Sequence, residues 1–277
     1  MNTRAEILQM VTDGVITQEE ADRLIDALGA SEQMEAEAPA APPEGWLEGY
    51  CTETEEPRSS IRIEVDVGGL QLLPSSDNKL RSEVRLHSMG DRLTNYSYGT
   101  ENRDGETYLY LKRKMFRPWG KGGAATLLVY VPQDSGLLTC KVNVGGCQAE
   151  NIRVEALKIQ TDTGGVKLRQ VRTKATEVRV TTGGIDYGRG NRAGERLELK
   201  ADVGAVTAFL PMDHGFHLFY STNVGKLVYK LPPQIRIMKT GTQSFIGDSG
   251  EILYGDGACE MKIETVTGAI QLKEDRG

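Results

Sequence analysis

The amino-acid sequence predicts a mainly β protein, a single-stranded β-solenoid (β-helix-like) of about 20-residue coils, with a small N-terminal α-helical hairpin. Glycine makes up 32 of the 277 residues, and from Gly145 onward one glycine recurs every 18 to 25 residues. Apolar residues stand at fixed distances on both sides of these glycines and alternate with polar residues, as in strands with one buried face. Intervals this short exclude βαβ units and suit the coils of a solenoid.

Residues 1–30 are predicted to form a two-helix module. Thr3 with Glu6, and Thr17 with Glu20, have the spacing of capping boxes, so each pair marks a helix start. Apolar residues follow at helical spacing, and Gly29 ends the second helix. Two helices this short bury little surface alone, so we expect them to bind a protein partner or a second copy of the chain.

Residues 31–58 are predicted to be an acidic Pro/Ala/Glu linker. Residues 1–58 contain 14 acids and 3 bases, a net charge of −11, whereas residues 59–277 contain 25 acids and 30 bases, a net charge of +5. The overall charge of −6 therefore combines two oppositely charged parts, which we expect to attract each other.

Residues 59–277 are predicted to form the β-solenoid domain. Alignment on one repeated glycine places an apolar residue or cysteine two positions later and five positions earlier in every unit. The aligned glycines are Gly68, Gly145, Gly164, Gly183, Gly204, Gly225, Gly250 and Gly268. An Asx or Thr usually stands two residues before the glycine, which is typical of a tight turn. Asp104-Gly105 predicts a hairpin between the tyrosine pairs that flank it, and this irregular region and the charged tail 273–276 are expected to cap the stack.

Residues 127–132, 142–146, 161–166 and 180–185 resemble the putative-adhesin β-solenoid domain family of bacterial cell-envelope-stress proteins. Residues 7–28 are similar to the SHOCT-like two-helix module that precedes this domain in some members. The resemblance implies a non-enzymatic interaction or sensor protein of the envelope stress response, with no catalytic residue and no cofactor. The alternatives from other classes are a β-helix carbohydrate-active enzyme and a polymer-forming structural solenoid.

Two pairs of side chains could in principle serve catalysis or metal binding, but both are better explained as parts of turns and loops. Asp162 and Asp202 occupy equivalent turn positions two units apart, about 10 Å, which is too far for a retaining carboxylate pair and at the outer limit for an inverting one. His214 and His217 lack the further ligands that a metal site needs. We therefore predict no catalytic, cofactor-binding or metal-binding residue.

A basic surface is the strongest candidate for binding. Residues 112–121 contain five bases, two aromatic residues and no acid, and outward-facing bases recur four positions before the repeated glycine. The candidate anion or partner patch comprises Lys112, Arg113, Lys114, Arg117, Trp119, Lys121, Lys141, Arg179 and Lys200. It would suit an anionic membrane surface or wall polymer, and no nucleic acid is expected. The structural alternative is an edge strand protected by its charges.

The sequence also carries an expectation about location. The N-terminus is too polar for a secretory signal, no apolar run is long enough to span a membrane, and four cysteines form no disulfide framework. These features predict a cytoplasmic protein that works at the periphery of the membrane or cell surface.

Overall fold

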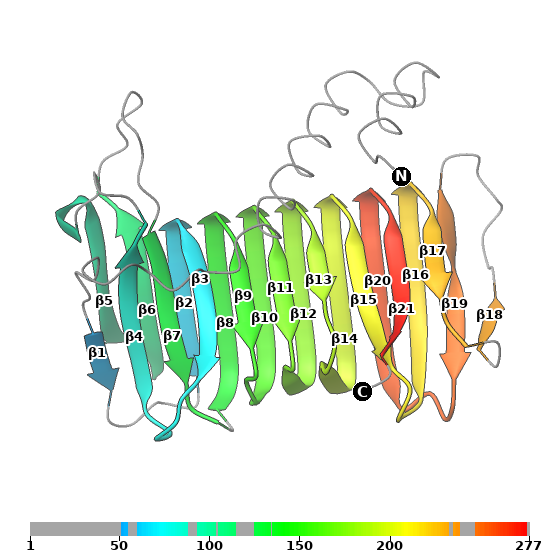
Figure 1. Cartoon of the computed structure of the whole chain (residues 1–277), viewed down its shortest axis with the longest axis horizontal. Helices are drawn as coiled ribbons and strands as arrows, with labels where there is room; N and C mark the ends of the chain where they lie inside the picture. The colour runs from blue at the N-terminus through cyan, green and yellow to red at the C-terminus, as the bar shows by residue number, and fades with distance from the viewer. Residues whose placement is uncertain are drawn as a thin grey trace, which may run out of the picture.

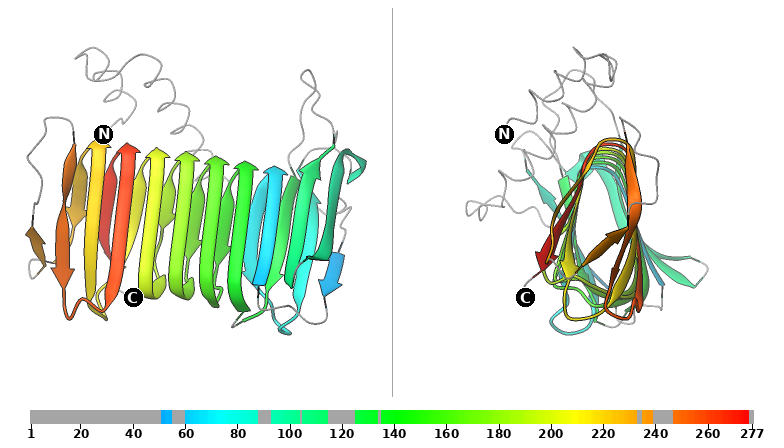
Figure 2. Two further views of the ribbon diagram at one scale, coloured as in Figure 1. Left: turned by 180° about the vertical axis from the view of Figure 1, so that it is seen from behind. Right: turned by 90° about the vertical axis from the view of Figure 1, so that its right-hand side faces the viewer.

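The computed structural model describes residues 51–54, 60–87, 93–103, 105–114, 125–133, 135–232, 235–238 and 247–275. These residues form two long, largely parallel sheets that face each other around one core (Figures 1 and 2). The prediction of a mainly β, solenoid-like fold is confirmed. The predicted helical hairpin and residues 31–50 of the predicted linker lie outside the described residues, but Cys51–Thr54, also assigned to the linker, forms strand β1.

The first sheet has ten strands in the order β1-β4-β7-β3-β9-β11-β13-β15-β21-β17. Their bounds are β1 Cys51–Thr54, β4 Leu80–Leu86, β7 Ala125–Val131, β3 Gly69–Pro74, β9 Cys147–Glu150, β11 Val166–Arg169, β13 Ile185–Tyr187, β15 Val206–Pro211, β21 Ile270–Asp275 and β17 Leu227–Lys230.

The second sheet has eleven strands in the order β18-β19-β16-β20-β14-β12-β10-β8-β2-β6-β5. Their bounds are β18 Arg236–Met238, β19 Asp248–Tyr254, β16 Phe216–Val224, β20 Cys259–Thr267, β14 Arg192–Val203, β12 Arg172–Thr182, β10 Val154–Thr163, β8 Ser135–Val144, β2 Ser60–Val67, β6 Glu106–Arg113 and β5 Tyr96–Arg103. A short 3-10 turn, η1 Leu93–Asn95, precedes β5. The antiparallel pairing of β5 with β6 confirms the predicted hairpin.

Each regular coil consists of one strand from each sheet. In the coil of β10 and β11, Ile159 and Val166 point inward and are 1% and 2% exposed. The equivalent residues of the next coil, Val178 and Ile185, are 0% and 2% exposed and stack directly on them in register. This stacking explains the aliphatic residues two positions after and five positions before the glycine, because each coil buries its apolar stripe only against its neighbours.

A ladder of glycines forms the turn at the upper edge of the stack in Figure 1. Seven glycines have φ values from 135° to 150°, and their order along the stack is Gly68, Gly145, Gly164, Gly183, Gly204, Gly268 and Gly225. A Cβ atom on Gly183 would lie 2.0 Å from the carbonyl oxygen of Gly164, so no side chain fits there. Gly250 does not belong to this ladder, contrary to the alignment, because it lies within β19 and pairs with Tyr220.

The order of the coils departs from chain order at both ends. β2 and β3 lie between β6–β7 and β8–β9, and β20 and β21 lie between β14–β15 and β16–β17. The prediction that the charged tail caps the stack is therefore wrong, because residues 273–275 belong to the inserted strand β21. The antiparallel strands β1, β4 and β5 close one end, and β18 and β19 lie beyond β16 at the other.

Candidate functional site

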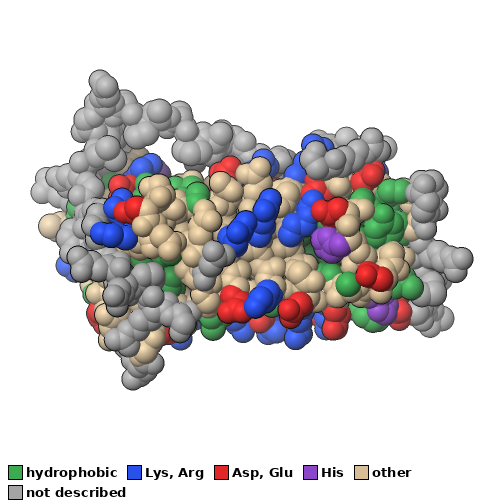
Figure 3. Space-filling model, turned by 90° about the horizontal axis from the view of Figure 1, so that it is seen from below, with side chains coloured by type: hydrophobic (Ala, Val, Ile, Leu, Met, Phe, Trp, Pro, Cys, Tyr) green, Lys and Arg blue, Asp and Glu red, His purple; other side chains and the backbone are tan. Residues whose placement is uncertain are grey.

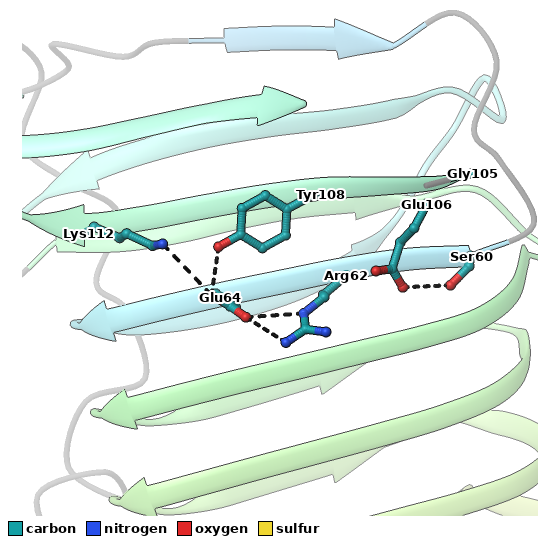
Figure 4. Close-up of a pocket in the computed structure, with 7 residues that line it drawn as sticks. All are labelled: Ser60, Arg62, Glu64, Gly105, Glu106, Tyr108 and Lys112. Atoms are coloured by element: carbon teal, nitrogen blue, oxygen red, sulfur yellow. Dashed lines mark hydrogen bonds and ion pairs between the residues drawn. The ribbon is translucent and has the colours of Figure 1, made fainter. Parts of the chain in front are cut away.

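A polar groove of about 600 Å³ lies on the outer face of the eleven-stranded sheet, where β2 pairs with β6. It is lined by Ser60, Arg62, Glu64, Gly105, Glu106, Tyr108 and Lys112 (Figure 4). Alternation explains the position of the polar side chains of β2, since Ile61 and Ile63 point into the core and Arg62 and Glu64 point out.

Glu64 is the centre of the groove's interactions. Its carboxylate accepts a hydrogen bond of 2.6 Å from the Tyr108 hydroxyl and bonds of 3.1 and 2.8 Å from the Arg62 guanidinium. The Lys112 ammonium lies 3.9 Å away. Burial opposes the charged form of Glu64, but the hydrogen bonds from Tyr108 and Arg62, together with the charges of Arg62 and Lys112, outweigh burial and lower the pKa of Glu64.

Tyr108 is the aromatic residue that lines the groove, and Tyr110 stacks on it at the groove's edge. The rings of Tyr108 and Tyr110 are stacked, with centroids 5.6 Å apart, and the Lys112 ammonium lies 5.7 Å from each centroid. The interaction with Tyr108 raises the pKa of Lys112, while burial followed by the bond to Glu64 raises the pKa of Tyr108. Tyr108 is 4% exposed, whereas Tyr110 is partly exposed.

The arrangement provides fixed, mutually compensated charges. The second carboxylate of the groove, Glu106, accepts a 2.8 Å hydrogen bond from the Ser60 hydroxyl. Two acids and two bases line the groove, so its formal charge is zero. Glu64 is held ionised, so it is unsuited to act as a general acid at neutral pH. Such a surface can orient a polar ligand through paired donors and acceptors.

The structure places the predicted basic segment only in part. Lys112 lines the groove, and Arg113 and Lys114 follow it at the end of β6. The remaining members, Arg117, Trp119 and Lys121, lie outside the described residues.

The predicted stripe Lys141, Arg179 and Lys200 does form one outward row across β8, β12 and β14. However, Arg179 is neutralised by Glu177 at 2.8 Å and by Glu198 at 3.3 Å. The next residue of the row is Glu264 on β20. The row is therefore a mixed-charge surface with isolated lysines.

The structure does not bring the two aspartates together as a catalytic pair or the two histidines together as a metal site. Asp162 and Asp202 lie on β10 and β14, with β12 between them. His214 Nδ1 lies 3.0 Å from Asp213, and His217 Nε2 lies 3.1 Å from Glu251, so the two histidines bind different carboxylates. Among the described residues, no group of three or more His, Cys, Asp or Glu side chains could hold a metal ion.

Sequence reasoning missed Ser60, Arg62, Glu64, Glu106 and Tyr108 as members of one site. The hairpin of β5 and β6 was predictable, but the parallel pairing that brings β6 to β2 joins residues 46 positions apart. Only the alternation of charge with Ile61 and Ile63 was visible as a signal.

These observations define a two-sheet β-solenoid whose candidate site lies on the outer surface of the stack. Residues 136–273 match the model of the family described as Toastrack DUF4097, so this segment, from β8 to β21, has the Toastrack fold. No curated protein sequence matches the chain significantly.

Solved structures of bacterial proteins show the same likeness. A structure described as a putative cell adhesion protein from Clostridium sporogenes has a TM-score of 0.50 and 15% identity, covering 82% of this chain and 99% of that chain. A structure described as a putative adhesin from Bacteroides fragilis has a TM-score of 0.44 and 13% identity, covering 82% and 97%. The similarity to the Clostridium structure, at 15% identity, shows a shared fold alone.

No helix in the described part of the chain is long and apolar enough to cross a membrane. The SHOCT-like module, the partners and the location stay predictions.

Proposed function

We propose that this protein is a non-enzymatic binding scaffold of the bacterial cell-envelope stress response, and that the groove between β2 and β6 binds a glycan strand of the cell wall. The Toastrack fold of residues 136–273 and the likeness to a structure described as a putative cell adhesion protein support a binding role. The envelope-stress context is an expectation from the sequence resemblance.

The bonding of Glu64 is the observation that carries the proposal. A glycosidase needs one carboxyl group that holds a proton near neutral pH and a second that is free to act as base or nucleophile. In the groove the pKa of Glu64 is lowered by Tyr108, Arg62 and Lys112, and Glu106 is bonded to Ser60. The carboxylates are arranged to accept hydrogen bonds from a ligand that stays intact.

The charge balance and the tyrosines indicate the class of ligand. A groove with zero formal charge has no electrostatic preference for a polyanion. Sugar hydroxyl groups can donate to carboxylates and accept from Arg62 and Lys112, while the apolar face of a sugar ring can pack on Tyr110. An uncharged wall glycan therefore fits the groove better than an anionic polymer does.

Titration with an oligomer of N-acetylglucosamine, an uncharged stand-in for a wall glycan, tests the proposal. We expect Tyr110→Ala to weaken binding by about tenfold through lost ring contact. Phe219→Ala removes an outward aromatic ring of the same sheet, on β16, and is the control that should leave binding unchanged.

Chromatography of the oligomer after incubation separates binding from catalysis. We expect its length distribution to stay unchanged. Shortening that Glu64→Gln abolishes would contradict the proposal and favour the carbohydrate-active enzyme. Equal loss of binding in both aromatic variants would refute the groove as the binding site.

A further inference from the structure

The turns at the lower edge of the stack share one conformation in three consecutive coils. Each begins with a residue in the left-handed region, with φ values of 53°, 53° and 75° for Asn151, Gln170 and Gly190. A residue with a buried side chain follows and then an arginine, which gives Arg153, Arg172 and Arg192. Arg153 pairs with Arg172 in an isolated parallel bridge, and Arg172 pairs with Arg192 between β12 and β14. The repeated turn therefore sets three arginines in register, and we name them the arginine row.

The arginine row places like charges side by side. Neighbouring strands lie about 4.8 Å apart, so the backbone positions of the row span about 10 Å. Like charges directly opposite each other across strands are destabilising. At one end, Arg192 is neutralised by Asp213 at 3.1 Å and by the buried carboxylate of Asp275 at 3.0 Å. Arg192 is therefore paired with carboxylates, whereas the charges of the other two arginines are not balanced in this way.

Arg153 and Arg172 are the unbalanced members. Both side chains are exposed. Within the residues that the structure describes, neither forms a salt bridge or a side-chain hydrogen bond. An arginine that only stabilised its turn would be expected to bond a carbonyl or carboxylate, as Arg192 does with Asn191 and Asp275.

Within the turns themselves, bases outnumber acids. The three turns, residues 150–153, 169–172 and 188–192, contain five arginines and one acid, Glu150. Arg189 lies over the ring of Phe209 at 5.4 Å, and Arg169 lies 3.9 Å from Asp186. Figure 3, which views the molecule from this side, shows Lys and Arg side chains near the middle of the lower face, with Asp and Glu side chains beside them.

We propose that the arginine row binds a linear polyanion bearing phosphate or sulfate groups, which lies along the solenoid axis. The planar guanidinium forms paired hydrogen bonds to such oxygens, which a lysine cannot do. One exposed arginine binds a single anion weakly, but adjacent arginines on a rigid scaffold engage successive groups of one polymer with a gain from multivalency. The row is separate from the groove and selects a different ligand chemistry.

Inorganic polyphosphate of defined length is the probe for this site. Binding to the full chain, measured by titration calorimetry, should strengthen at least tenfold from orthophosphate to a polymer long enough to span about 10 Å, and then level off. Equal affinity for orthophosphate and the long polymer would overturn the proposal. Tighter binding to phosphatidylglycerol vesicles than to the long polymer would also overturn it, in favour of a membrane surface.

Paired variants locate the site. Arg153→Gln with Arg172→Gln should weaken binding of the long polymer at least tenfold and lower the dependence of log affinity on log salt by about one to two. Lys158→Gln with Lys262→Gln makes the same change in net charge at two lysines of the outer sheet face and should have little effect.

Equal loss in both pairs of variants, or no loss in the arginine pair, would refute the assignment. Thermal unfolding of each variant checks that the fold is retained. Failure here leaves the glycan test of the groove untouched, because the arginine variants alter no groove residue and the probes differ.

Discussion

The central coils and the two ends of this solenoid use the same glycine turn but connect their coils differently. From β8 to β15 the four coils stack on one another in chain order, and the two middle coils, β10–β11 and β12–β13, contact the coils that precede and follow them in the sequence. At both ends one coil is placed out of order, β2–β3 at one end and β20–β21 at the other. The comparison shows that the repeated glycine specifies how a coil turns, whereas pairing between distant segments decides where the coil lies.

The out-of-order coil is the first to be formed in the chain at one end and the last at the other. At the first end the chain lays down β2–β3, builds outward through β4 to β7, and returns to the inner side of β3 to begin β8. At the other end it builds β16–β17, turns through β18 and β19, and returns to fill the place beside β14–β15. The central coils depend on stacking between segments that are close in the sequence, and the ends depend on pairing between strands that are far apart in the sequence.

The largest effect should come from removing a coil, and it should depend on which coil is removed. Deletion of residues 165–183, one whole 19-residue repeat, joins equivalent turn positions and should leave a shorter folded stack. Deletion of residues 259–275 removes the coil on which both β14–β15 and β16–β17 stack and should abolish cooperative unfolding. Circular dichroism during heating measures both, and equal behaviour would contradict the comparison.

Substitution within the glycine ladder should have the next largest effect. Gly183→Ala would place a Cβ atom 2.0 Å from the Gly164 carbonyl at a φ of 138°, so we expect a loss of about 3 kcal/mol or more in the free energy of unfolding. Gly184→Ala is the matched control, because its Cβ would lie 3.3 Å from the nearest atom and Ala205 fills the same place in the next coil. Urea unfolding measures both variants. A similar loss in the two would refute the claim that the ladder positions require glycine.

Asp275→Asn should break the anchor of the inserted end coil. Asp275 accepts hydrogen bonds from the Gly190 amide at 2.9 Å and from Arg192 at 3.0 Å, and its side chain is 1% exposed. Loss of this charge should lower the free energy of unfolding by about 2 kcal/mol. The loss stays this small because the partner, Arg192, keeps partial access to water. Asp213→Asn removes the exposed partner of the same arginine and should cost under about 0.5 kcal/mol. Comparable losses would argue against a special role for Asp275.

High pH should destabilise the central coils through their buried thiols. Burial raises the pKa of Cys147 to about 12 and that of Cys140 well above its ordinary value. An unfolded thiol ionises near pH 8.5, so the folded chain binds more protons above that pH, and stability falls as pH rises.

Urea unfolding between pH 8 and pH 10 tests this prediction. The decline should be roughly 1 kcal/mol per thiol for each pH unit above 9. The double variant Cys140→Ala with Cys147→Ala should show a shallower decline. An unchanged slope in that variant would assign the pH effect to other groups.

The sequence predicts the centre of the molecule well because its signal there is local. The glycines from Gly145 to Gly204 and the apolar residues around them identify the turns, the inward faces and the stacking. Gly250 shows the limit of such a pattern, since its neighbours match the repeat although it lies in an antiparallel strand. Neither the order of the end coils nor the groove could be predicted, because both arise from pairing between distant strands.

The arginine row, in contrast, left a signal in the sequence. Arg153 and Arg172 stand eleven residues before Gly164 and Gly183, and Arg192 stands twelve residues before Gly204. A register shift between β12 and β14 absorbs the extra residue. The alignment extended only five residues before each glycine, so it covered the upper turns and omitted the lower ones.

Cross-linking across β14 tests the central claim about coil order most directly. Lys200 lies opposite Glu264 of β20, whereas stacking in chain order would place it opposite Ser221 of β16. Under mild oxidation the variant Lys200→Cys with Glu264→Cys should form an intramolecular disulfide, and Lys200→Cys with Ser221→Cys should not. A disulfide between positions 200 and 221, with none between 200 and 264, would contradict the account.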